Sequence, residues 1–176
     1  MRRGWVIGAV ALGMLAFVGS AARADEDYDN NLPAVAKNLA NAKLTLDQGI
    51  TAAAKAGKPI SAQYEIDEDS HKFQLSVFVS KDDDLLEVIV DHNTGATKDP
   101  ENVIGDDIKD AKNQRKAMQK ATMSLADACA AAAKANPGYT VVQVIPVTKG
   151  ADPVANIMLI KLSDAKDVKK IAQKLD

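Results

Sequence analysis

Apolar residues recur at the spacing of an α-helix in two segments that lie 79 positions apart. Residues 46–56 read LDQGITAAAKA and residues 125–135 read LADACAAAAKA. In both, apolar residues fall at i, i+4, i+7 and i+8, which is one face of a helix. A capping pattern marks the start of each segment: Thr45 and Gln48 form it in the first, and Ser124 and Asp127 in the second. We therefore predict that one unit with a helix at its start was duplicated.

The predicted helices also have stop signals. Gly57 can adopt the left-handed conformation that ends a helix, and Pro59 prevents the helix from resuming. Asn136-Pro137-Gly138 is the corresponding stop in the second copy. Positions 37, 39 and 42 match positions 116, 118 and 121 at the same offset. This match predicts a further helix before each copy.

Alternating apolar and polar residues follow the first helix. The runs Ile60–Ile66, Phe73–Val79 and Leu86–Val90 each place apolar side chains on one face, which is typical of a half-buried strand. Short acidic segments separate them, as expected of hairpin turns. We predict an antiparallel meander with the helix covering its apolar face.

The second copy departs from this pattern. Residues 141–147 and 155–162 are almost continuously apolar, which predicts strands buried on both faces. After them Ser163 has the character of a helix cap, and Val168, Ile171, Ala172 and Leu175 recur at helical spacing. The predicted fold class is α+β, with two units that each consist of a helix packed on a small antiparallel sheet, and an extra C-terminal helix.

The N-terminus has the layout of a cleaved secretory signal. Arg2 and Arg3 precede an apolar run shorter than the ~20 residues that span a bilayer, and small residues at Ala22 and Ala24 suit a cleavage site. We predict a signal peptide over 1–24, a first repeat with its preceding helix over 25–97, a linker over 98–106 and a second repeat over 107–176. The expected location is periplasmic or secreted, without a stable membrane anchor.

Charge and cysteine content narrow the possibilities further. Without residues 1–24 the chain has 19 basic and 24 acidic residues, a mildly acidic balance that argues against nucleic-acid binding. Its single cysteine, Cys129, allows no internal disulfide, so the exported protein depends on its apolar core. Cys129 lies on the apolar helix face, where it is expected to pack in the core.

The first copy resembles the PepSY domain, a small exported bacterial module with a helix on a three-stranded antiparallel sheet. The resemblance covers residues 44–97 and, in part, 123–162; its most recognisable element is Asp91-x-x-Thr94-Gly95, which the second copy lacks. It implies either a propeptide domain that restrains a metalloprotease or a free-standing exported protein. The chain is similar to the second kind, because it contains no metalloprotease domain.

Nothing in the sequence has the pattern of an active centre. His71 and His92 have no nucleophile or dedicated orienting acid beside them, and HExxH, paired-cysteine, nucleophile-elbow and phosphate-loop motifs are absent from the sequence. We predict no enzymatic activity, no catalytic residue, no metal site and no cofactor. The acidic runs 67–69 and 82–84 would suit calcium only if they shared one end of the sheet.

Two surface features suggest binding instead. Phe78 and Ile89 point away from the predicted core face, so they either pack against the other repeat or form a patch for a partner. A basic stripe precedes the second copy and is either a solvated helix face or a docking surface for an anionic partner (Lys109, Lys112, Arg115, Lys116, Lys120).

The preferred hypothesis is a non-catalytic protein that binds another protein, with a protease as one candidate, through a sheet face or edge. A small-ligand or metal sensor of the cell envelope is the alternative, with the ligand between the repeats. A structural envelope component that only oligomerises is the third. The sequence does not indicate the oligomeric state.

Overall fold

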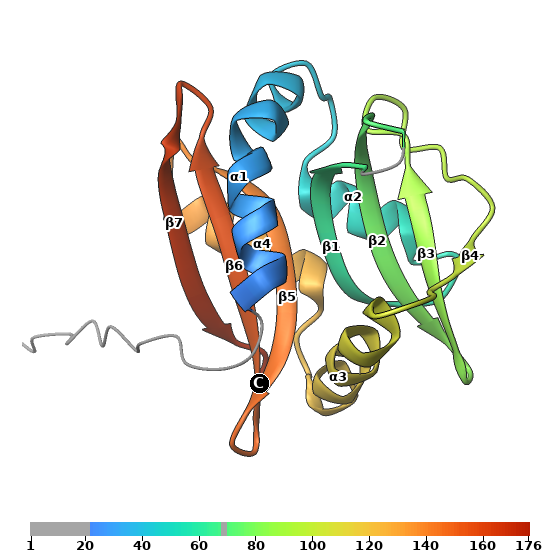
Figure 1. Ribbon diagram of the computed structural model, residues 1–176. Coiled ribbons are helices and arrows are strands. Elements are labelled where there is room, and N and C mark those ends of the chain that lie inside the picture. Colours follow the sequence, from blue (N-terminus) through green and yellow to red (C-terminus); the bar gives the residue numbers. More distant parts are fainter. Residues whose placement is uncertain (1–21, 68–69) are drawn as a thin grey trace, which may run out of the picture.

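The computed structural model describes residues 22–67 and 70–176, and these form an α+β fold with four helices and one seven-stranded antiparallel sheet (Figure 1). The element order places two helices before a run of strands, and this order occurs twice. The elements are α1 (Ala22–Leu39), α2 (Leu46–Ala53), β1 (Lys58–Ile66), β2 (Phe73–Lys81), β3 (Asp84–Val90), β4 (Glu101–Asn102), α3 (Asp107–Lys120), α4 (Leu125–Ala135), β5 (Thr140–Lys149), β6 (Asp152–Lys161) and β7 (Asp164–Lys174).

The sheet has the strand order β4-β3-β2-β1-β5-β6-β7, so the first strand of each half lies at its centre. There, β1 and β5 pair at only two positions, Ala62 with Val144 and Gln63 with Gln143. The hydroxyl of Tyr28 in α1 donates to the carbonyl oxygens of Tyr64 (2.8 Å) and Val142 (3.2 Å) beside this short ladder. One side chain thus satisfies backbone groups of both central strands, and the two halves share one sheet.

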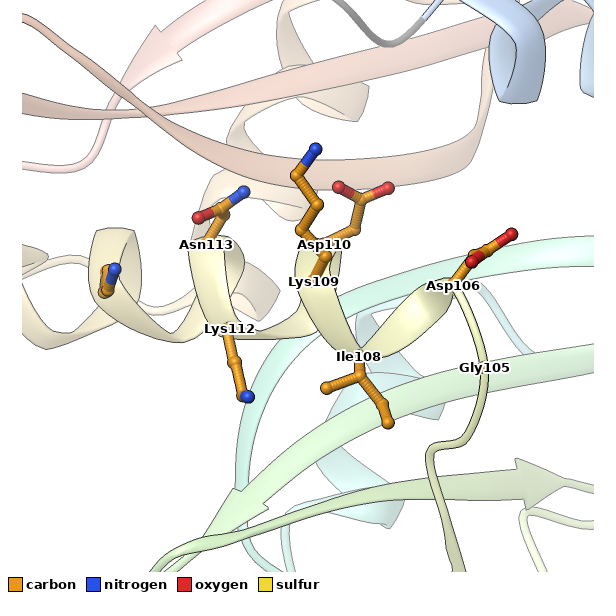
Figure 2. Close-up of a pocket in the computed structure, with 8 residues that line it drawn as sticks. Gly105, Asp106, Ile108, Lys109, Asp110, Lys112 and Asn113 are labelled. Carbon is orange, nitrogen blue, oxygen red and sulfur yellow. The ribbon is translucent and has the colours of Figure 1, made fainter.

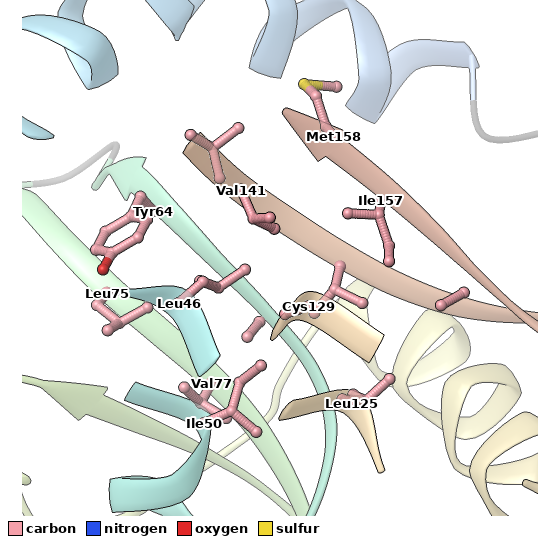
Figure 3. Packing of buried hydrophobic residues seen from close by; sticks show 14 of the residues in the cluster. Leu46, Ile50, Tyr64, Leu75, Val77, Leu125, Cys129, Val141, Ile157 and Met158 are labelled. Atoms are coloured by element: carbon pink, nitrogen blue, oxygen red, sulfur yellow. The ribbon is translucent and has the colours of Figure 1, made fainter. Parts of the chain in front are cut away.

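One face of the sheet packs against α2 and α4. Figure 3 shows Leu46 and Ile50 of α2 and Leu125 and Cys129 of α4 in the same apolar layer as side chains of β2 and β6. All four are at most 2 % exposed. The predicted helix faces are therefore confirmed, except that Ala54 lies beyond the end of α2 and is exposed. Both caps are also confirmed: Thr45 N donates to Gln48 Oε1 at 3.0 Å, and Asp127 N donates to Ser124 Oγ at 3.1 Å.

The opposite face of the sheet is covered unevenly. Helix α1 lies over the β5–β6 side, and Met158 of β6 points toward it (Figures 1 and 3). This confirms that β5 and β6 are buried on both faces. Helix α3, which matches α1 in the element order, contacts β1, β5 and β6 and also reaches β3. Most of the same face of β2 and β3 is not covered by a helix (Figure 1).

The predicted C-terminal helix is wrong, because residues 164–174 form β7. Leu162 and Ser163 lie in a tight turn, so Ser163 caps no helix. The edge of the apolar strand β6 requires a backbone partner, and β7 supplies it from Lys174 opposite Val154 to Val168 opposite Ile160. Apolar residues three or four positions apart in such a short segment are compatible with a helix and with a strand. Pairing with β6 makes this segment a strand.

Two smaller predictions also change. Helix α2 ends at Ala53, and Gly57 does not have positive φ, so it does not end the helix in the predicted way. Gly57 instead allows close packing, since a Cβ there would lie 2.8 Å from the backbone oxygen of Ser80. The segment expected to be a linker, 98–106, contains the short strand β4, which pairs with Leu86 and Glu87.

The predicted signal peptide lies outside the described residues, except for Ala22–Ala24 in the first turn of α1. Across the part of the chain that the structure describes, no helix is both long and apolar enough to cross a bilayer.

Candidate functional site

The uncovered sheet face carries a polar groove of about 500 Å³. Its floor is formed by β1, β2 and β3 with Gln143 and Ile145 of β5 beside them, and its walls by α1 and α3. Tyr28 and Asn31 of α1 and Asp107 and Asp110 of α3 line it. Each of these α1 residues lies 79 positions before its α3 counterpart, so equivalent turns of the two helices form opposite walls.

The same sheet face has different chemistry in the two halves. In the first half Gln63 pairs with Ser76 across β1 and β2, whereas in the second half Gln143 pairs with Met158 across β5 and β6. The helices differ in the same way. Val35 of α1 is fully buried, while its counterpart in α3, 79 positions on, is Gln114. The groove therefore exists where apolar contacts of the second half are replaced by polar side chains.

Glu65 lies on the groove floor and is held in place by two amides. Gln74 Nε2 donates to Glu65 Oε1 at 2.8 Å, and Gln63 Nε2 donates to Glu65 Oε2. Gln143 Nε2 in turn donates to Gln63 Oε1 at 2.9 Å, so the amides form a chain across the centre of the sheet. This chain fixes the orientation of the carboxylate.

The electrostatic environment of Glu65 disfavours its charged form. Burial raises the pKa of the Glu65 carboxyl, the hydrogen bonds from Gln74 and Gln63 oppose that rise, and the negative charges of Glu87 and Asp67 add to it. The net shift of the pKa is upward. Glu65 thus loses solvation on folding without being compensated by a described cation.

Two further carboxylates, Glu87 and Asp107, line the groove. Ser76 Oγ donates to Glu87 Oε1 at 2.5 Å across β2 and β3. At the α3 wall, burial raises the pKa of Asp107, and the charges of Asp110 and Asp106 raise it further. The groove therefore concentrates negative charge at the sheet face.

Two glutamines that line the groove, Gln114 of the α3 wall and Gln143 of β5, have unused hydrogen-bonding capacity. Gln114 is 8 % exposed and accepts from Ser61 Oγ at 2.8 Å, but its Nε2 has no partner among the described residues. Gln143 is 7 % exposed and donates to Gln63, and its Oε1 likewise has no described partner. Both side chains line the groove. They leave one donor and one acceptor available to a bound group.

The predicted binding residues lie at this face. Phe78 is half-buried and lines the groove, while Ile89 lies on the same side of the sheet outside the lining. The strand register pairs Phe78 with Glu87 and Ser76 with Ile89, so Phe78 and Ile89 are diagonal neighbours. The register places the two residues next to each other on one face, with Glu87 opposite Phe78 on β3 and Ser61 opposite it on β1.

The Asp91-x-x-Thr94-Gly95 motif forms a turn at the end of β3, outside the groove lining. Asp91 Oδ1 accepts from the backbone N–H groups of Asn93 (2.8 Å) and Thr94 (2.9 Å), and Gly95 has φ 77°. These hydrogen bonds lower the pKa of Asp91. The turn presents the His92 carbonyl oxygen to two backbone N–H groups of the segment before α2. The motif thus has a clear structural role.

The second copy makes the same contact without the motif. The backbone N–H groups of Lys43 and Leu44 donate to His92 O, and those of Thr122 and Met123, 79 positions later, donate to Leu175 O. The end of β7 therefore replaces the turn.

Cys129, His71 and His92 lie outside the groove lining and contribute to packing or to a turn. Cys129 is buried, which raises the pKa of its thiol to about 12. The ring of His92 packs edge-on against Phe73 with centroids 4.9 Å apart, and His71 occupies the β1–β2 turn with φ 55°. The two acidic turns lie at opposite ends of β2, and residues 68 and 69 of the first are not among the described residues. The described residues include no cluster of three metal-ligating side chains.

A second depression, of about 670 Å³, follows the outer surface of α3 and includes part of the basic stripe. Figure 2 shows its side chains pointing in different directions, with Ile108 and Lys112 on one side of the helix and Lys109 and Asn113 on the other. Arg115 instead reaches the Asp83 carbonyl oxygen at 3.2 Å. These groups do not converge on a ligand, as a binding site requires.

No family model, no curated protein and no solved structure matches this chain. The groove must therefore be interpreted from its own chemistry.

The acidic groove was not among the features predicted from the sequence. A signal was present, because Ser61, Gln63 and Glu65 make one face of β1 polar, while the corresponding face of β5 and β6 is mainly apolar and has Gln143 and Asn156 as its polar residues. That difference becomes informative only once α1 is known to lie over β5 and β6 and to reach the first half at β1.

Proposed function

We propose that this chain is a non-catalytic exported protein that binds another protein through the groove on β1–β3. The observation that carries the proposal is the polar groove, which lies on the sheet face that α1 covers in the second half. Buried polar floor residues and half-buried Phe78 give this face the mixed character of a protein interface. A protease is the first candidate partner, given the resemblance of residues 44–97 to PepSY domains, and the tandem PepSY-like organisation belongs to the same proposal.

Recognition through the face agrees better with the described contacts than recognition through an edge. The β3 edge is already paired with β4, and β7 carries Lys166, Lys169, Lys170 and Lys174, as is common in strands that resist edge pairing. The groove offers side-chain recognition without strand addition.

Photo-crosslinking in the producing cells tests the proposal directly. The photoreactive residue p-benzoylphenylalanine would replace Phe78 or, as a control, exposed Lys134 on α4 at the opposite face. We expect a discrete heavier product from position 78 and none from position 134. Absence of any product at 78, with normal protein levels, would argue against a protein partner.

A small-ligand sensor is the second candidate, because about 500 Å³ is within the range of small-molecule pockets. A thermal-shift screen with pooled metabolites distinguishes it, since a ligand that binds only the native state raises the melting temperature. A shift that disappears in Glu65→Gln would favour this alternative.

A further inference from the structure

The groove contains negative charge that the described protein does not balance. Five carboxylates line it (Glu65, Asp67, Glu87, Asp107, Asp110), and among the described residues no lysine, arginine or histidine lines it or forms an ion pair with any of the five. Asp67 is solvated and interacts with the charges of Lys98 and His71, so the unbalanced charge is that of the other four. Charges that lose solvation are normally paired, because leaving them unpaired destabilises the fold. A bound cation would relieve this cost.

The unpaired amides specify more than a charge. Gln143 Oε1 is an acceptor that suits an ammonium or guanidinium donor, whereas Gln114 Nε2 is a donor that suits a carbonyl oxygen. A peptide with a basic side chain offers both groups together, whereas a simple polyamine lacks the carbonyl. This pairing favours a peptide segment.

Phe78 supplies the apolar part of such a site. It lines the groove beside Glu87, its cross-strand neighbour. Lysine and arginine side chains bury their methylene stems along apolar surfaces while the charged end reaches polar groups, and an aromatic face also attracts the cation itself. The floor thus matches the two parts of a basic side chain.

The wider charge distribution acts in the same direction. Residues 25–106 contain 17 acidic and 7 basic side chains, whereas residues 107–176 contain 7 acidic and 12 basic ones. The groove floor belongs to the acidic part. The resulting field attracts a basic segment to this half of the molecule and raises the rate of encounter.

We propose that the groove binds a lysine or arginine side chain presented by an extended basic segment of the partner protein, with Glu65 and Glu87 as its anionic ligands. This inference rests on the proposed function and specifies the chemistry of the partner.

Fluorescence anisotropy with short labelled peptides tests the inference. The probe is the heptapeptide Gly-Ser-Lys-Gly-Lys-Ser-Gly at about 150 mM salt, where surface charge is largely screened. We expect it to bind, and we expect acetylation of both lysines or their replacement by glutamate to abolish binding. Glu65→Gln should raise Kd about tenfold, which is typical of losing one charged hydrogen-bonded contact.

Asp152→Asn is the matched control, because it removes the same charge at an exposed position in the β5–β6 hairpin, outside the groove. Its Kd should stay within twofold of the original protein. Equal Kd values for Glu65→Gln and the original protein would overturn the inference, as would binding of spermidine without binding of the peptide. A crosslink at position 78 without lysine-dependent peptide binding would leave the proposed function standing and refute this inference alone.

Discussion

Glu65 is the residue whose position is hardest to explain by stability. Its carboxylate is desolvated and near two other carboxylates, and its pKa is raised as a result. Because the folded state binds the proton more tightly than the unfolded state, the contribution of Glu65 to stability is present at low pH and is lost as the pH rises through the folded pKa. A side chain that destabilises the fold near neutral pH is typical of a functional site.

Glu65→Gln should therefore alter the pH dependence of stability. The variant cannot lose a proton, so its free energy of unfolding relative to the original protein should increase between pH 4 and pH 7. Urea unfolding at both pH values measures this difference, with exposed Glu101→Gln as the control. An identical pH dependence in Glu65→Gln and the original protein would contradict the raised pKa.

The thiol of Cys129 is expected to be chemically silent in the folded protein. Burial raises its pKa to about 12, so almost no thiolate is present at pH 8. Ellman's reagent should react with it only after denaturant is added. Rapid reaction in native buffer would show that the helix face carrying Cys129 is accessible.

At the scale of elements, the approach of α2 to β2 depends on a glycine inside the helix. A Cβ at Gly49 would lie 2.1 Å from Leu75 Cδ2, and Leu75 is fully buried. Helix α2 therefore sits closer to the sheet than any larger residue at position 49 would allow.

Gly49→Ala should destabilise the protein by about 1–2 kcal/mol, because overpacking outweighs the gain in helix propensity. In a Leu75→Ala background the clash is absent, so the same substitution should stabilise. Denaturant unfolding of the four proteins gives the coupling energy. A destabilisation of equal size in both backgrounds would show that the contact is not responsible.

The turn at the end of β3 depends on Asp91. Asp91→Ala removes the acceptor for two backbone N–H groups, and the melting temperature at pH 7 should fall. The hydrogen bonds lower the pKa of Asp91, so this stabilisation is present above the unfolded pKa and is lost as the pH falls through the folded pKa. The difference in melting temperature should therefore shrink at strongly acidic pH, and a constant difference would contradict the account.

The helices and strands differ in how well the sequence predicts them. Local signals were enough to predict helix α2, which Thr45 caps. They were also enough for strand β1, in which apolar and polar residues alternate strictly. Strand β7 could not be predicted, because Val168 and Ile171 fit a helix face as well as an edge strand. Whether this segment forms a helix or a strand is decided by hydrogen bonding to the backbone of β6. The spacing of apolar residues within the segment does not reveal that pairing.

For the whole molecule, the short ladder between β1 and β5 joins the two halves of one sheet, and the core is continuous across them. Tyr28 reinforces this join with hydrogen bonds to both strands. The groove is also a feature of the whole molecule, because most of its floor comes from the first half and one of its walls is α3 of the second half. The polar face of β1 was a local signal, but it could not locate the groove by itself, because the groove arises from the unequal coverage by α1 and α3.

The continuous core predicts a single unfolding transition. Tyr28→Phe should lower the free energy of unfolding by about 1 kcal/mol, the usual net contribution of such a hydrogen bond. The loss should appear equally in probes placed in either half, for example in hydrogen exchange of β2 and β6. Separate transitions for the two halves would contradict a shared core.

The most direct test of the central claim is a titration of the ¹⁵N-labelled protein with the lysine heptapeptide, followed by backbone amide chemical shifts. The account predicts saturable changes that cluster on β1 and β2 around Gln63 and Gln74 and that weaken in Glu65→Gln. Changes confined to the outer surface of α3 or to β7, or no change at all, would contradict it.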